Sequence, residues 1–414
     1  MSLRADADQI IRESLQAVLP DAAVMRALER HTLTGDCYVI AIGKAAYRMA
    51  AAAQSVLHQQ IKAGLVITKY DHCGGALPGF EQVEAGHPIP DQNAILGTQK
   101  ALDMVGSLTE RDNVVFLVSG GGSALFEYPL TGVTLSDIAD VTGQLLRCGA
   151  DIVEINAIRK HLSSVKGGRF AEACSPARVL TIVLSDVLGD PLDSIASGPT
   201  CPDTSTSAMA LAILEKYRIE ASGAVKTALQ KETPKALTNV VTEITGNVRI
   251  LCEAACKSAK ALGYEPLLLT TLLSCEAREA GMLLSAMAAE VRASGNPQKA
   301  PCALIMGGET VVHISGTGKG GRNQEFALAA SLGLAGMEDV LIFSLGSDGT
   351  DGPTDAAGGI VDGRFVSQCS ARGFDIHAVL RDNDSYTLLK EMNALLVTGP
   401  TGTNVNDLAV ALIR

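Results

Sequence analysis

The chain has 414 residues, of which 47% are hydrophobic and 19% are charged, and its formal net charge is -11. This balance predicts about two folded domains and excludes a disordered chain, since single cores rarely grow past roughly 250–300 residues. The acidic charge, the absence of Trp and an aromatic content of only 4% argue against a nucleic-acid-binding protein, which needs basic surface and stacking side chains.

The N-terminus and the cysteines indicate a soluble, cytoplasmic protein. The initial segment MSLRADADQIIRESL carries acidic residues where a signal peptide needs an apolar core, so it predicts an amphipathic helix instead. No apolar run reaches the ~18 residues of a membrane span. The ten Cys residues include no C-x-x-C pair and are scattered along a large chain, and this scatter is typical of a reducing compartment. Cys252 and Cys256 are interpreted as small core residues.

In the first half of the chain, short apolar runs alternate with helical patterns. Continuous apolar runs of this kind are typical of strands that are covered on both faces of a parallel sheet. We expect strands at 37–42, 65–68, 114–118 and 179–184, and helices at 45–57, 93–105 and 135–146. This alternation predicts an open doubly wound parallel sheet, in which the carboxyl ends of the strands share the edge where ligands bind.

A more polar stretch at 231–247 marks the expected domain boundary. We therefore assign residues 1–237 to a Rossmann-like N-terminal domain and residues 238–414 to a second α/β domain. In the second domain we expect helices at 250–262 and 276–293, and strands at 266–270, 302–306, 310–315, 340–345 and 394–397. Because a tight Gly307-Gly308 turn separates the runs 302–306 and 310–315, we expect these two strands to form a hairpin.

Two Gly-rich turns follow predicted strands of the first domain. Gly43 and Lys44 open a helix, where a lysine is unfavourable for the helix dipole unless an anion lies between them. A surface lysine is the alternative. The second turn can fold its N–H groups into an anion-binding nest, with a flexible turn as the alternative. It consists of Ser119, Gly120, Gly121, Gly122 and Ser123.

Acidic residues follow two predicted strands, one in each domain. Asp186 and Asp190 come after the strand at 179–184, and Asp348 and Asp351 come after the strand at 340–345. Mg²⁺ prefers one or two carboxylates together with phosphate oxygens, so these four residues are candidate metal ligands. Asp186 or Asp351 is the favoured general base. Helix capping and Asx-turns are the alternative interpretations.

A third Gly-rich segment, at the start of an apolar helix, combines two cations with polar side chains. It contains Lys319, Gly320, Gly321, Arg322 and Asn323. This composition fits an oligophosphate clamp in which the arginine stabilises charge on the transferring phosphoryl group. A solvated basic turn is the alternative. Asn404, placed past the last expected strand, is a further candidate for phosphate contact, with plain capping as its alternative.

Several other enzyme classes lack their motifs. The chain has no Walker A motif, no H-E-x-x-H and no G-x-S-x-G. Gly316, Gly318 and Gly321 match the G-x-G-x-x-G of a dehydrogenase, but the run before them looks like half of a hairpin. Asp348, the acid at the end of the next expected strand, also lies farther from Gly321 than the ~20 residues expected. A non-enzymatic anion sensor would need the glycine turns but not the acids.

Long motifs in a fixed order resemble the class II glycerate 2-kinases with a MOFRL-type C-terminal domain, some of which are labelled hydroxypyruvate reductase. The resemblance covers almost the whole chain and departs at Glu127, where small or apolar residues are more usual. The motifs are IGKAA at 42–46, HPIPD at 87–91, SGGGSAL at 119–125, EINAIRKHLSSVKGGRFA at 154–171, GGET at 307–310, GKGGRNQE at 318–325, SDGTDGPTDAAG at 347–358 and GPTGTNVNDL at 399–408.

The resemblance implies ATP-dependent phosphorylation of D-glycerate at its 2-hydroxyl, with Mg²⁺, in a cleft between two α/β domains. It also implies that Lys44 and Arg322 are the catalytic lysine and arginine. An NAD(P)H-dependent hydroxypyruvate reductase is the alternative activity. We expect a small-molecule substrate and no nucleic-acid or membrane partner, and we leave a homodimer open.

Overall fold

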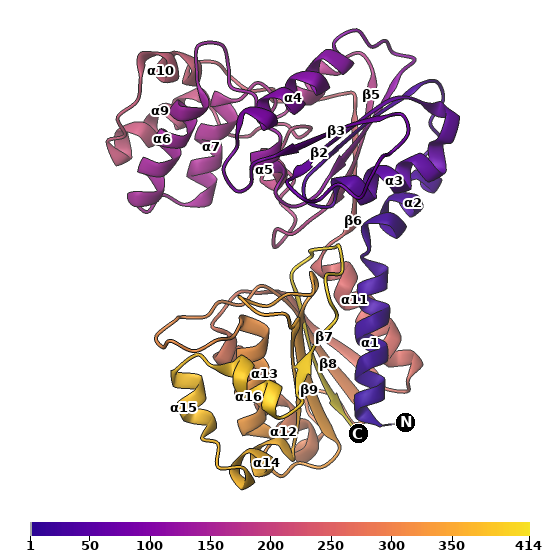
Figure 1. The fold of residues 1–414 in the computed structure, drawn as a ribbon, viewed down its shortest axis with the longest axis vertical. Coiled ribbons are helices and arrows are strands. Elements are labelled where there is room, and N and C mark those ends of the chain that lie inside the picture. The colour runs from indigo at the N-terminus through magenta and orange to yellow at the C-terminus, as the bar shows by residue number, and fades with distance from the viewer. Residues whose placement is uncertain (1) are drawn as a thin grey trace. The chain divides into compact units, whose positions relative to one another are not determined.

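The computed structural model describes residues 2–414 as two compact α/β units, in agreement with the predicted fold class (Figure 1). The first, here called the central unit, is Pro20–Thr245, and the second, here called the terminal unit, combines Met1–Leu19 with Gly246–Arg414. The expected ranges, 1–237 and 238–414, therefore differ from these units mainly at the N-terminus.

The N-terminal helix belongs to the terminal unit because its buried face packs there. Helix α1 (Leu3–Ala17) buries Ile10, Ile11 and Leu15 and packs against α11 (Val248–Ala261). Its buried Asp6 accepts a hydrogen bond of 2.6 Å from the hydroxyl of Tyr264 and pairs with Arg414. The first helix is thus bound to the last residue of the chain.

The central unit contains a six-stranded sheet in the order β3-β2-β1-β4-β5-β6. Its strands are β1 (Cys37–Ile42), β2 (Ile61–Lys69), β3 (Phe80–Ala85), β4 (Asn113–Val118), β5 (Arg178–Leu184) and β6 (Val240–Gly246). The pairings β1–β2, β1–β4, β2–β3 and β4–β5 are all parallel, and β4 is buried at every position. Strand order reverses between β1 and β4, the point at which sheets of this Rossmann-like type bind ligands.

Helices cover both faces of this sheet. The core on one face joins Ile40 and Ile42 to Ala94 and Ala101 of α4 (Gln92–Val105). Helix α3 (Ala46–Leu57) packs on β1 and β2 from the other side, together with α2 (Pro20–Arg30). Four short helical segments complete the loops, namely η1 (His58–Gln60), α5 (Gly122–Leu125), α8 (Arg169–Ala173) and η2 (Ile195–Ser197).

A separate helical cluster lies at one end of the central unit, on the left in Figure 1, and has its own hydrophobic core. It consists of α6 (Leu135–Arg147), α7 (Ile152–Leu162), α9 (Ser207–Tyr217) and α10 (Gly223–Leu229). Capping boxes at Thr134 and Asp151 start α6 and α7 by satisfying their first N–H groups. Helix α7 carries Arg159, Lys160 and His161 in its last turn.

The terminal unit contains a mixed six-stranded sheet in the order β11-β10-β9-β12-β8-β7, in which only β7 and β8 pair in parallel. Figure 1 shows α1 and α11 on one face and the remaining helices of the unit on the other. The strands are β7 (Glu265–Leu273), β8 (Cys302–Gly308), β9 (Val340–Gly346), β10 (Gly358–Asp362), β11 (Leu395–Leu396) and β12 (Asp407–Ile413). The helices are α12 (Ala277–Ser294), α13 (Arg322–Leu334), α14 (Phe365–Ala371), α15 (Ile376–Arg381) and α16 (Ser385–Glu391).

The structure corrects two strand predictions in this unit. The hairpin predicted from 302–306 and 310–315 is wrong, because Val311 makes only an isolated bridge to Glu276 while β8 pairs with β7 and β12. The last strand is not 394–397, since β12 follows it and fills the centre of the sheet. Asp407 is consequently the first residue of a buried strand and not a loop residue.

Other expectations from composition agree with the structure. All ten cysteines are free thiols, and Cys252 is fully buried in α11, whereas Cys256, also expected in the core, is only half-buried. Across residues 2–414, no helix combines the length and the apolar character needed to cross a membrane. His161 is fully buried, and its Nδ1 lies 2.9 Å from the carbonyl oxygen of Ala157 on the preceding turn, so it has a structural role in α7.

Candidate functional site

The turns after β1 and β4 contact each other where strand order reverses. The N–H of Lys44 donates to the carbonyl of Gly120 at 2.9 Å. The hydroxyl of Ser119 accepts from the N–H of Ala45 at 3.0 Å and donates to the carbonyl of Ile42 at 3.1 Å. Gly43 has a φ of 107°, and a Cβ there would lie 2.3 Å from Ser119 Oγ, so this approach needs glycine.

Asp186 and His87 lie against the same turn. A Cβ on Gly120 would lie 2.2 Å from Asp186 Oδ2, and a Cβ on Gly121 would lie 3.0 Å from His87 Nε2 and 3.4 Å from Lys44 Cγ. Burial raises the pKa of Asp186, while the charge of Lys44 opposes this shift. Burial and then the charge of Lys44 lower the pKa of His87. A carboxylate, an ammonium side chain and an imidazole therefore surround two glycines.

The N–H groups of this turn are free to bind an anion. Within residues 2–414, none of the N–H groups from Gly120 to Ser123 donates to a protein acceptor. Asp190 stands in the turn after Asp186, where its N–H donates to the carbonyl of Val187 at 3.1 Å and its φ is 52°. The structure thus brings together Lys44, the glycine turn and Asp186.

Ser123, at the end of the turn, faces a buried polar cluster. Its hydroxyl lies 2.9 Å from that of Ser197, and its carbonyl accepts from Lys166 Nζ at 2.9 Å and from Arg159 Nη2 at 3.2 Å. Lys160 pairs with Asp193 at 3.0 Å and with Asp203 at 3.2 Å. The sequence prediction singled out Ser123 but none of these cations.

Glu127, the residue that departs from the family pattern, forms an internal ion pair. Lys166 Nζ lies 2.9 Å from Glu127 Oε2, and both side chains are fully buried. Burial lowers the pKa of Lys166 to about 8, and the charge of Glu127 opposes this shift. Because breaking a buried pair leaves one charge uncompensated, the pair can be tested by stability measurements.

We expect Lys166→Met alone to destabilise the protein by roughly 3–5 kcal/mol. The double variant E127L/K166M should recover most of this loss. Between pH 8 and 10.5 the folded protein holds fewer protons on Lys166 than the unfolded chain does, so this group adds stability as the pH rises through that window. The midpoint temperature of thermal unfolding, measured at several pH values, should show this gain in stability in the wild type and not in the double variant. Equal stability of the single variant and the wild type would refute the internal pair.

Arg322, the first residue of α13, is held by two acids of the terminal unit. Its Nε and Nη2 bind the carboxylate of Asp407 at 2.6 and 2.9 Å, and its Nη1 lies 3.2 Å from Glu309 Oε1. Burial alone would lower the pKa of Arg322, but the hydrogen bonds and charge of Asp407, together with the charge of Glu309, raise it. The guanidinium therefore stays charged and is fixed in two directions.

Asp351 caps α13 from another segment of the chain. Gly321 precedes the helix without a side-chain cap, and the Asp351 carboxylate accepts from the N–H groups of Asn323 at 3.2 Å and Gln324 at 2.9 Å. Burial raises the pKa of Asp351 to about 6, against the effect of these hydrogen bonds. Both oxygens of this carboxylate already have partners.

The remaining candidates of the terminal unit make contacts of their own. Lys319 Nζ lies 4.6 Å from the ring centre of Tyr386, a cation–π distance. Asp348 Oδ1 accepts from the N–H of Thr350 at 3.0 Å, which matches the Asx-turn interpretation. Asn404 Oδ1 lies 3.4 Å from the N–H of Asn406. Gly320 packs so closely on Ser385 that a Cβ there would lie 2.2 Å from Ser385 Oγ.

The dehydrogenase motif is not placed as a dinucleotide site requires. No strand leads into Gly316, and the glycines instead pack against the turn at 382–384, where a Cβ on Gly316 would lie 2.3 Å from Asp382 Cα. In a Rossmann unit the glycines join a strand to a helix. The match is therefore a coincidence of close packing.

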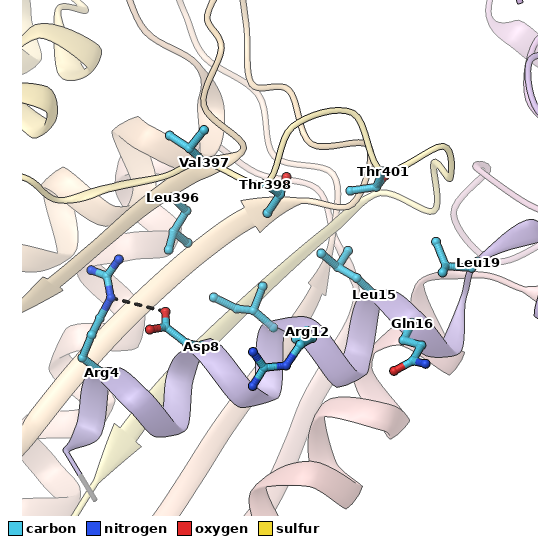
Figure 2. A pocket seen from close by; sticks show the side chains of 11 residues that line it. Arg4, Asp8, Arg12, Leu15, Gln16, Leu19, Leu396, Val397, Thr398 and Thr401 are labelled. Atoms are coloured by element: carbon cyan, nitrogen blue, oxygen red, sulfur yellow. Dashed lines mark ion pairs between the residues drawn. The ribbon is translucent and has the colours of Figure 1, made fainter.

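In the part of the chain that the structure describes, no three His, Cys, Asp or Glu side chains are grouped as a bound metal ion would need. A cavity of about 510 Å³ does occur in the terminal unit, between α1 and the segment after β11. Figure 2 shows Arg4, Asp8 and Arg12 on the helix side of this cavity and Leu396 and Val397 opposite. None of the residues that the sequence predicted for the site lines it.

Sequence reasoning missed the partners that hold these cations. Strand β12 was not predicted, although DLAVALI is a continuous apolar run, and the role of Asp407 at its start in holding Arg322 was therefore not predicted either. His87 and Arg159 lie within the motifs HPIPD and EINAIRKHL, but their spacing in the sequence does not show that they reach the glycine turn. Only the crossovers between distant strands bring them there.

Comparison with known proteins agrees with the fold, which joins a Rossmann-like unit to a second α/β unit. Residues 6–230 match the domain of unknown function DUF4147, and residues 302–407 match the MOFRL family. These matches define a two-domain class that joins a DUF4147 domain to a MOFRL domain.

Individual relatives show which family within this two-domain class the chain belongs to. The chain is 54% identical over 412 residues to D-glycerate 2-kinase of Thermotoga maritima, covering 100% of this chain and 99% of that protein. The crystal structure of glycerate kinase from Thermotoga maritima superposes with a TM-score of 0.98, covering 100% and 99% of the two chains at 54% identity. A protein of Agrobacterium vitis named as a hydroxypyruvate reductase is 39% identical, covering 98% and 94%. The chain belongs to the class II glycerate 2-kinase family.

Proposed function

We propose that this protein is a D-glycerate 2-kinase that transfers the γ-phosphoryl group of ATP to the 2-hydroxyl of D-glycerate, giving 2-phosphoglycerate and ADP. The observation that carries the proposal is the contact of Lys44 with a turn of free N–H groups at the reversal of strand order. This arrangement can hold anionic groups without covalent chemistry, and phosphoryl transfer needs little else. The relatives named glycerate 2-kinase support it.

In the proposed reaction, the 2-hydroxyl oxygen forms a bond to the γ-phosphorus as the bond from that phosphorus to the bridging oxygen of ADP breaks. The hydroxyl proton passes to a carboxylate. Asp186 is the better base, since burial raises its pKa towards the working range and its carboxylate lies on the glycine turn. Asp351 is the second candidate, although both of its oxygens accept N–H bonds from α13.

Lys44 and Arg322 supply the positive charge for the same phosphoryl group in this proposal. Charge placed where negative charge develops stabilises the transition state more than the ground state. The remaining candidates are proposed contacts for nucleotide phosphates or for glycerate. They are Gly43, Ser119, Gly120, Gly121, Gly122, Ser123, Lys319, Gly320, Gly321, Asn323 and Asn404. The expectation of one interdomain site stays a proposal, and X-ray scattering with and without both substrates would test closure.

We propose that Mg²⁺ accompanies ATP as part of the substrate. The donor set fits this role because Mg²⁺ needs only one or two carboxylates beside phosphate oxygens. Asp186 is the best-placed carboxylate, Asp190 and Asp348 are further candidates, and the occupied oxygens of Asp351 fit less well. When bound, the ion neutralises phosphate charge. Chelation with EDTA should abolish turnover, and added Mg²⁺ should restore it.

A coupled ADP-release assay tests the activity directly. Purified protein is assayed with ATP and, in turn, D-glycerate, L-glycerate, hydroxypyruvate and tartronate. Turnover that is fastest with D-glycerate supports the proposal. Oxidation of NAD(P)H by hydroxypyruvate without ATP would support the reductase activity instead.

We also propose a cytoplasmic location, in agreement with ten free thiols, and a homodimer, which light scattering would test.

The contact between Gly120 and Asp186 gives a sharp prediction. In Gly120→Ala the new Cβ would meet Asp186 Oδ2 at 2.2 Å and displace the carboxylate, so kcat should fall by about 10²-fold, as misplacement of a catalytic group by ~1 Å can do. Gly223→Ala is the matched control, because no atom lies within 4 Å of a Cβ there. Full turnover of the Gly120 variant would remove Asp186 from the proposed chemistry.

A further inference from the structure

We propose that Arg159 is the carboxylate-binding residue for the hydroxy-acid substrate, an inference that rests on the proposed function. The first observation is that the cations near Ser123 differ in whether a carboxylate neutralises them. Lys160 pairs with Asp193 and Asp203, and Lys166 pairs with Glu127. Among residues 2–414, Arg159 pairs with no carboxylate, and its one hydrogen bond goes to the carbonyl of Ser123.

An arginine that has no carboxylate partner within the protein can bind an anion from outside it. Arg159 is half-buried in the last turn of α7, and its guanidinium carries five N–H donors, of which one is used. Partial burial strengthens its interaction with an anion, because the effective dielectric constant falls below that of water. The planar fork of a guanidinium matches the two oxygens of a carboxylate.

The position of Arg159 relative to Lys44 suits a small hydroxy acid. Lys44 is bonded through its N–H to the carbonyl of Gly120, and Arg159 is bonded to the carbonyl of Ser123. Three residues of chain span at most about 10 Å, and less where α5 begins at Gly122. The Lys44 side chain lies against this turn at Gly121, where a Cβ would be 3.4 Å from Lys44 Cγ, and the Arg159 guanidinium lies at its far end, at Ser123.

Strained backbone at the same corner supports a binding role. Ala196, Ser197 and Gly198 have φ values of 51°, 60° and 64°, so three successive residues adopt left-handed conformations. Each such non-glycine residue costs on the order of 1–3 kcal/mol and is kept mainly where geometry serves function. The strain places the buried Ser197 hydroxyl 2.9 Å from Ser123 Oγ and 3.4 Å from Asn156 Oδ1. These hydroxyls flank the segment that Arg159 contacts.

The test compares Arg159→Gln with wild type in ADP-release kinetics. Glutamine retains a donor for the Ser123 carbonyl but removes the charge. Hydrogen bonds to charged groups are worth roughly 1.5–3 kcal/mol, so the KM for D-glycerate should rise on the order of 10–100-fold. The KM for ATP should change by less than about 3-fold, which is less than the loss of one hydrogen bond to a charged group would cause, since no ATP contact is lost. Arg147→Gln, an exposed arginine of the same unit, is the control.

A neutral analogue adds a readout that a structural role would not change. Wild type should strongly prefer D-glycerate to D-glyceramide, and Arg159→Gln should lose most of that preference. Arg159→Lys, which keeps the charge, should recover part of it. An unchanged KM for glycerate, or a KM for ATP that rises in parallel, would overturn the proposal, the second result indicating a phosphate contact instead.

Failure of the proposed activity can be told apart from failure of this inference. If wild type released no ADP with D-glycerate, the kinase proposal would fail, and calorimetric titration of glycerate into the same proteins would decide on Arg159. Weaker binding to Arg159→Gln than to wild type and Arg147→Gln would support the site. Equal binding, or no binding to wild type, would refute it. Circular dichroism of Arg159→Gln and Arg159→Lys checks that each is folded.

Discussion

Replacing Arg322 by Ala should lower kcat for ADP release by on the order of 10³, the effect of removing an arginine that stabilises a transferring phosphoryl group. Asp407 fixes the guanidinium through two hydrogen bonds, and Glu309 holds the remaining nitrogen at a partly exposed position. An incoming phosphate can therefore replace the weaker partner, Glu309, while Asp407 keeps the side chain oriented. Steady-state kinetics with saturating ATP and D-glycerate measure the effect.

This variant needs a control for folding, because it leaves the buried Asp407 without its cation. Burial raises the pKa of Asp407, against the hydrogen bond and charge of Arg322 and a hydrogen bond from Asn323, which lower it. The double variant R322A/D407N should recover thermal stability and stay inactive. Arg364→Ala, an exposed arginine paired with Asp362, should behave as wild type. Full turnover of folded R322A/D407N would exclude Arg322 from the mechanism.

Lys44→Ala should lower kcat by on the order of 10²–10³, since a positioned charge at the phosphoryl group is worth several kcal/mol. The backbone contact of residue 44 with Gly120 does not depend on the side chain, so the turn should stay folded. Lys62→Ala, an exposed lysine of β2, is the matched control. Kinetics at saturating substrates give the measurement.

The same variant has a second readout that is independent of turnover. The charge of Lys44 lowers the pKa of His87, so its removal should let His87 titrate at a higher pH. NMR titration of the His87 ring protons would follow this change. An unshifted His87 together with normal kinetics would return Lys44 to the role of an ordinary surface lysine.

The sequence predicted the central unit better than the terminal unit, for a physical reason. Strands such as β1 and β4 are continuous apolar runs bounded by glycine turns, so their type and their parallel order can be inferred. The terminal sheet is largely antiparallel, and its order joins segments far apart in the chain, such as β12 with β8 and β9. The pattern of apolar residues along the chain does not predict which of these strands pair.

The candidate site, too, could be predicted from the sequence only in part. Glycines and cations after strands were visible, and the structure gathers Gly43, Lys44, Gly120 and Asp186 at one turn. The partners of Arg322 and the state of Arg159 were not visible, because charge pairing depends on tertiary contacts. The Asp351 carboxylate illustrates the difference, since the sequence suggested a ligand or a base and the structure shows both oxygens bound to the start of α13.

The interleaved arrangement of the chain has a consequence for biosynthesis. Pro20–Thr245 forms one contiguous unit, whereas α1 must wait for α11 before it can bury its apolar face. Domains fold as they emerge from the ribosome, at about 5–20 residues per second. The central unit can therefore be complete while the apolar face of α1 is still exposed, and synthesis of α11 is the earliest moment at which this face can be covered.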